Sequence, residues 1–174
     1  MNQEQTNKRR QWLEVAAVLA RWLVGALFIY MGLKKAVHPG EFLKLVRQYD
    51  MVSSSLVLNS IAAALPWFEV FCGLLLLAGV AIRGAAVVLI AMLVPFTLIV
   101  LKRALAIAAA KHMAFCLVKF DCGCGAGEVF ICNKLLENSL LILVAAWFIS
   151  GAGQKLALRF KLLPSSPAAA VRST

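Results

Sequence analysis

The sequence predicts an all-α integral membrane protein, a four-helix bundle with a short interfacial helix and a Cys-Gly-Cys loop between the third and fourth spanning helices. Of its 174 residues, 62% are apolar and only 15% are charged. Mean hydropathy is +0.85, a value that a soluble domain of ordinary composition does not reach. The apolar residues also gather in four runs close to the roughly 20 residues that a bilayer requires. We expect a transmembrane domain over residues 12–152, between a basic segment 1–11 and a basic, disordered tail 153–174.

The first run covers about residues 12–37 and follows the basic cluster Lys8-Arg9-Arg10. It is too long for a cleaved signal peptide, and no small-residue cleavage site precedes a soluble domain. His38-Pro39-Gly40 then breaks the helix. Apolar residues recur at helical spacing between residues 42 and 49, with charged residues on the opposite side. This pattern predicts a short helix lying in the membrane interface.

The second run covers residues 61–82 and is interrupted only by Pro66 and Glu69; Asn59 or Ser60 is its expected N-cap. The third covers residues 85–101 and continues through residues 104–110. The fourth runs from residue 135 to 149 or 152 and carries the polar Asn138, which we place at the opening of the last helix. Four spans put both termini on one side of the membrane.

The basic residues give the chain a net charge of +10 but do not fix its orientation. The 18 Lys and Arg residues divide evenly between the two sides of a four-span topology. Because the first helix usually dominates orientation, the compact cluster before it favours cytoplasmic termini and a Cys-Gly-Cys loop outside. The charges are spread over loops and helix ends, so we expect contact with anionic membrane lipids and no nucleic-acid binding.

The cysteines carry the most specific chemical hypothesis. Cys72 lies inside the second run, and Cys116, Cys122, Cys124 and Cys132 surround the last loop. Four cysteines allow three disulfide pairings. A bond between Cys122 and Cys124 would close a very small, strained ring that exchanges easily.

The glycines of Asp121-Cys122-Gly123-Cys124-Gly125 permit a tight turn, and Gly123 and Gly125 let a partner approach closely. Two other readings stay open. The loop cysteines are either ordinary structural disulfides or reduced thiols in a tight turn, or all four thiolates hold a metal ion. The paired two-residue spacings of zinc sites are absent, so we assign no metal.

Glu69 is the residue within the membrane that requires explanation. A carboxylate inside an apolar span normally faces the bundle interior and has a partner. Lys35, at the end of the first run, is the expected ion-pair partner, while Lys34 reaches the interface. Cys72 follows Glu69 by three residues and shares its helix face. The pair either fixes helix registration or handles protons or quinone.

Pro66 removes a backbone hydrogen bond one turn before Glu69 and is expected to kink the helix towards a cavity. Trp67 and Phe68 either line that cavity or serve as packing and interface residues. Four glycines are expected at close contacts between helices: Gly25, Gly32, Gly73 and Gly79.

Three groups of residues resemble one protein family. They are Arg21, Gly25, Phe28, Gly32 and Lys35; then Pro66, Trp67, Glu69, Gly73 and Arg83; and then Asp121-Cys122-Gly123-Cys124-Gly125. The pattern resembles the DoxX-like membrane proteins and, among them, most closely the MauE branch. The resemblance implies a four-helix protein of the bacterial inner membrane. It also implies a link to maturation of the disulfide-rich small subunit of methylamine dehydrogenase and, through DoxX relatives, to quinone-linked oxidation.

The hypothesis that combines these observations is thiol–disulfide exchange. A labile Cys122–Cys124 disulfide accepts electrons from an extracytoplasmic thiol protein, and Cys116 and Cys132 act as a second pair or as a staple. Electrons then pass to quinone near Glu69, Cys72 and Trp67, with no covalently bound cofactor. The alternative is a non-catalytic membrane subunit that anchors a partner oxidoreductase, with structural disulfides or a metal at the loop cysteines.

Overall fold

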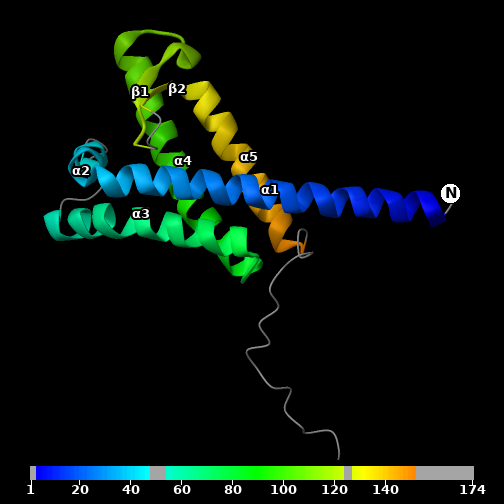
Figure 1. The fold of residues 1–174 in the computed structure, drawn as a ribbon. Helices are drawn as coiled ribbons and strands as arrows, with labels where there is room; N and C mark the ends of the chain where they lie inside the picture. The colour runs from blue at the N-terminus through cyan, green and yellow to red at the C-terminus, as the bar shows by residue number, and fades with distance from the viewer. Residues whose placement is uncertain (1–2, 48–53, 124–126, 152–174) are drawn as a thin grey trace, which may run out of the picture.

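A computed structural model describes residues 3–47, 54–123 and 127–151, and Figure 1 shows their arrangement. The helices are α1 (Gln3–Val37), α2 (Pro39–Arg47), α3 (Ser55–Ala78), α4 (Ile82–Lys111) and α5 (Ile131–Ile149). The segment between α4 and α5 contains a 3-10 turn, η1 (Phe115–Leu117), and the strands β1 (Lys119–Asp121) and β2 (Glu128–Phe130). In these described ranges, α1, α3, α4 and α5 are long and apolar enough to cross a membrane. The predicted helical membrane fold is therefore confirmed, whereas the predicted C-terminal tail lies outside the described residues.

Local sequence explains where α1, α2 and α3 begin and end. Pro39 occupies the first position of α2, where its missing N–H costs nothing, and the amide of Phe42 donates to the His38 carbonyl at 3.2 Å. Helix α3 starts at Ser55 after the N-cap residue Ser54, so the predicted cap at residues 59–60 is wrong. Gly79 ends α3 in the left-handed conformation, with φ of 71°, where only glycine is unstrained. Its predicted role in helix packing is therefore replaced by a capping role.

The four long helices form two pairs. Figure 1 shows α1 beside α3, while α4 and α5 cross this pair. Apolar side chains from all four helices meet where the pairs cross, among them Val24, Cys72, Leu89 and Phe148. Large apolar side chains such as Leu23, Phe71 and Leu143 stay exposed, as expected for a surface that faces lipid.

Glycines let α1 and α3 approach closely. A Cβ atom added to Gly25 would lie 2.9 Å from the carbonyl oxygen of Gly73, and one added to Gly73 would lie 2.6 Å from that of Gly25. A Cβ at Gly32 would lie 2.7 Å from the carbonyl oxygen of Pro66. Real Cβ atoms do not approach so closely, so the close-packing role predicted for these three glycines is confirmed.

The segment between α4 and α5 is a β-hairpin, which sequence analysis had predicted only as a loop. Strands β1 and β2 pair antiparallel, with Lys119 opposite Phe130 and Asp121 opposite Glu128. The hairpin runs back along α4 towards α2 (Figure 1) and packs on Val100 and Ala104 of α4. Its tip is thereby carried towards the helix bundle.

Candidate functional site

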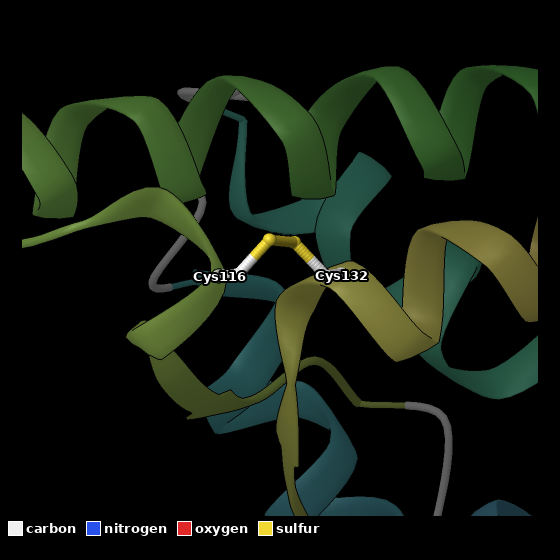
Figure 2. Close-up of a disulfide and its surroundings, with 2 residues drawn as sticks. All are labelled: Cys116 and Cys132. Carbon is white, nitrogen blue, oxygen red and sulfur yellow. A yellow bond between two sulfur atoms is a disulfide. The ribbon is translucent and has the colours of Figure 1, made fainter.

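One disulfide closes the base of the hairpin. It joins Cys116 in η1 to Cys132 in the first turn of α5, 16 residues later, with the Cα atoms 5.1 Å apart (Figure 2). This is the pair that sequence analysis had assigned as a second thiol pair or a staple. Because the two sulfur atoms are bonded to each other, they are not thiolates, and this state of the chain does not offer the four-thiolate metal site considered above.

Cys122 lies at the tip of the hairpin and is buried. Only 1% of its surface is exposed, and it belongs to an apolar cluster with Val118 and Ile131. The hairpin folds back and covers this thiol, while the outer location predicted for the loop stays a prediction. Cys124 and Gly125 lie outside the described residues, so a Cys122–Cys124 bond stays a prediction.

The backbone at the tip turns immediately after Cys122. The amide of Gly123 donates to Asp121 Oδ1 at 2.9 Å, and Gly123 has a φ of +78°, which favours glycine. A Cβ built on Gly123 would lie 3.7 Å from the Phe42 ring and 3.7 Å from Leu45 Cβ. The tip of the hairpin therefore rests on the apolar face of α2.

The predicted ion pair between α1 and α3 is confirmed. Lys35 Nζ donates to Glu69 Oε1 at 2.5 Å and to Oε2 at 2.8 Å. The two side chains are only 6% and 10% exposed. Lys34 is exposed and lies 5.1 Å from the centre of the Tyr30 ring, consistent with the interfacial position predicted for it.

Lys134 is a third charged residue of this region, and sequence analysis missed it. We had counted it among the basic residues outside the membrane, but it is 2% exposed and its Nζ lies 3.0 Å from Glu137 Oε2. Its charge also acts on Glu69. Lys134, Glu137 and Asn138 are spaced three and four residues apart and share one face of α5. That polar stripe in an apolar helix was the signal that would have identified Lys134.

Asn138 links α5 to α4 inside the bundle. Its Nδ2 donates to Thr97 Oγ1 at 3.1 Å, and the Thr97 hydroxyl donates to the Leu93 carbonyl at 2.7 Å. Helix α5 begins at Ile131, so Asn138 lies about two turns inside it and does not open it. Its amide nitrogen thus has a partner on a neighbouring helix, as is common for buried amides within a membrane.

Three other predicted site residues are not members of the ion pair. Cys72 is buried in the apolar cluster that contains Phe28 and Leu76. Trp67 is 61% exposed and Phe68 is 55% exposed, so both lie on the outer surface of α3. Of the two alternatives given for them, lining an internal cavity is therefore wrong, and a position on the outer surface fits the interface role. Neighbouring positions on one turn of a helix point to different sides, and Glu69 takes the inward one.

Arg21, noted above only as part of a family pattern, is also buried in α1, with 1% of its surface exposed. The described bundle thus contains buried cationic side chains on α1 and α5 and a buried carboxylate on α3. Such residues are costly inside a membrane and mark positions where structure or function depends on charge.

Comparison with known proteins agrees with this architecture. A family model described as methylamine utilisation protein MauE matches residues 13–151, which include all four spanning helices and the hairpin. No curated protein and no solved structure matches the chain. The match covers most of the sequence, so the chain is a membrane protein that belongs to the MauE family of methylamine utilisation proteins.

Proposed function

We propose that this protein carries out thiol–disulfide exchange at the outer face of the bacterial inner membrane, in support of the maturation of an extracytoplasmic enzyme. Family membership ties the chain to methylamine utilisation. The resemblance described above implies, as its substrate, the disulfide-rich small subunit of methylamine dehydrogenase. The observation that carries the proposal is the hairpin itself, which combines a disulfide at its base with a Cys-Gly-Cys sequence at its tip. With the hairpin at the outer face of the membrane, the four-span topology places both termini in the cytoplasm.

The proposed exchange begins with a Cys122–Cys124 disulfide. A thiolate of the substrate attacks one of its sulfur atoms, and the other sulfur leaves as a thiolate. The second substrate thiol then attacks the mixed disulfide. The substrate leaves with a new disulfide, and the loop holds two thiols that carry the two electrons removed from the substrate.

Reoxidation of the loop requires a two-electron acceptor, and we assign this role to a quinone. The two loop thiols give up two electrons and two protons, re-form their disulfide and leave the quinone as a quinol. The apolar surroundings of Cys122, formed by Val118, Ile131 and α4, support a lipid-soluble acceptor. These apolar surroundings favour reduction of the quinone beside the hairpin over reduction at the site near Trp67 that sequence analysis had assigned. The DoxX-like resemblance points to the same acceptor class.

The Lys35–Glu69 pair takes a supporting role in this proposal. Both oxygens of Glu69 are engaged by Lys35, and the charge of Lys134 adds to their attraction. A carboxylate held in this way is suited to fix the registration of α1 against α3 beneath the hairpin. Proton handling during quinone reduction is the second role that we propose for it.

The test is oxidation of a reduced, disulfide-rich periplasmic substrate by membranes that contain this protein and a quinone. Cys122→Ala and Cys124→Ala should abolish disulfide formation in the substrate, as followed by alkylation and mass spectrometry. Cys72→Ala is the matched control, because Cys72 is a buried cysteine of the same chain in a different apolar cluster from Cys122, and this variant should keep full activity. Oxidation that survives loss of both hairpin-tip cysteines would refute the proposal.

The second candidate is a non-catalytic membrane subunit that anchors a partner oxidoreductase. The Cys116–Cys132 bond favours it, because a bond at the base of a hairpin acts as a staple whether or not the tip reacts. This candidate predicts co-purification of a stable partner from detergent. It also predicts that enzyme maturation survives removal of Cys122 and Cys124.

A further inference from the structure

A single side chain, that of Phe42, connects the tip of the hairpin with the buried ion pair. Phe42 projects from the second turn of α2 and is buried. One part of its ring faces Gly123, where an added Cβ would lie 3.7 Å from Cε2. Lys35 Nζ lies 5.5 Å from the centre of the same ring, and this ammonium group is held by Glu69. The Phe42 ring therefore lies between Gly123 and the Lys35–Glu69 pair.

The Phe42 ring sets the separation between the hairpin tip and the Lys35–Glu69 pair. An ammonium group near an aromatic ring is attracted by the negative charge density of its face, and the attraction grows as water is excluded. Glu69 fixes the position of the ammonium group, and the ammonium group in turn favours one position of the ring. A methyl group at Gly123 would just touch that ring, and Gly123 is bonded to Cys122. The ring thus offers a short path from the ion pair to the residue next to Cys122.

We infer that Phe42 is a positioning residue for Cys122, whose ring holds the hairpin tip in register with the Lys35–Glu69 pair and so makes the redox equilibrium of Cys122 depend on that pair. The inference deepens the proposed function, on which its biological meaning rests. The inference gives α2 a second role besides lying in the membrane interface, because the tip of the hairpin packs on the buried face of α2. It also gives the ion pair an effect on thiol chemistry without direct contact with a sulfur atom.

The experiment measures the equilibrium of Cys122 with glutathione in the purified full-length protein, without substrate or quinone. Membranes or detergent micelles are equilibrated in glutathione buffers of graded potential, trapped by alkylation and analysed by mass spectrometry for Cys122 alone. Phe42→Leu keeps the apolar contact but removes the ring, and Phe42→Tyr keeps the ring. We expect Phe42→Leu to change the equilibrium constant at least about threefold, and Phe42→Tyr to restore the wild-type value within about twofold.

Combination with Glu69→Gln tests the path through Lys35. If Phe42 transmits the effect, Glu69→Gln changes the equilibrium constant in the wild-type background but has a much smaller effect with Phe42→Leu, and the departure from additivity is at least about twofold. Leu45→Ala is the matched control. Leu45 also lies near Gly123, but the described contacts of Lys35 are with Phe42 and Glu69. The fold-change that Leu45→Ala causes in the equilibrium constant should therefore be the same with and without Glu69→Gln.

Two results would overturn the inference. One is an equal shift for Phe42→Leu and Phe42→Tyr, and the other is a Glu69→Gln effect of the same size with and without the Phe42 ring. The comparison of the two Phe42 variants decides the question by itself if Glu69→Gln does not fold. Because no substrate is present, failure here leaves the oxidation assay of the previous section unaffected. Conversely, a protein that does not oxidise substrates can still show the coupling.

Discussion

Removal of Glu69 should destabilise the protein more than removal of Lys35, although the two residues form one ion pair. Loss of one partner of a buried pair costs about 3–5 kcal/mol, because the other charge stays buried without compensation. In Lys35→Met, Glu69 keeps the attraction of Lys134. In Glu69→Gln, the ammonium groups of Lys35 and Lys134, with side chains 6% and 1% exposed, lose the carboxylate that lies near both. We therefore expect about 3 kcal/mol for Lys35→Met and about 5 kcal/mol for Glu69→Gln.

The assay is reversible denaturation in mixed micelles, followed by circular dichroism, with each variant compared at equal protein and detergent concentration. Lys34→Met is the matched control, because Lys34 is the adjacent lysine on α1 but is exposed, and its loss should cost under about 1 kcal/mol. The double variant Lys35→Met with Glu69→Gln should be less destabilised than the sum of the single variants. A Lys35→Met protein that is as unstable as Glu69→Gln, or more so, would show that Lys134 does not support Glu69, and the assignment of a three-residue cluster would fail.

Two further predictions concern the packing of the bundle and its hairpin. Gly73→Ala should destabilise the protein by about 1–3 kcal/mol, since its Cβ would meet a backbone carbonyl 2.6 Å away. Gly84→Ala should be neutral or stabilising by up to about 1 kcal/mol, since its added Cβ meets no described atom within 4 Å beyond its own helix backbone and chain neighbours. Thermal unfolding of both variants in detergent checks this order of stability. Cys132→Ala should destabilise the hairpin by about 3 kcal/mol, because its disulfide closes a segment of 16 residues. Hydrogen exchange should show this loss at β1 and β2, and unchanged protection there would contradict a stapling role.

The spanning helices were predictable because a bilayer strongly constrains the length and composition of a helix that crosses it, and mean hydropathy along the sequence detects both. The Lys35–Glu69 pair was predictable for a related reason, since a carboxylate inside a span needs a cation and Lys35 was the nearest candidate at the right depth. Lys134 was missed because its position near a helix end suggested a solvated side chain. Only the packing of α5 against the other helices turns that side chain inward.

The hairpin was missed for a different reason. Each strand has three residues, which is too short for an alternating pattern to be recognised, and the pairing is long-range information that the local sequence does not contain. Burial of Cys122 follows from that pairing, because it depends on the hairpin folding back along α4. The orientation of Trp67 was likewise a question of helix rotation, which hydropathy does not determine.

The three cysteines that the structure describes between α4 and the first turn of α5 call for two different explanations. A staple accounts fully for Cys132, since its bond to Cys116 joins the two ends of the hairpin. It does not account for Cys122, which lies at the opposite end of the hairpin, in the apolar cluster with Val118 and Ile131. The turn itself is maintained by Asp121 and Gly123. The proposed function explains a buried cysteine that is followed by a second cysteine two residues later by its reactivity. Burial then determines how such a thiol reacts, because a substrate reaches it only when Cys122 leaves the apolar cluster that it forms with Val118 and Ile131.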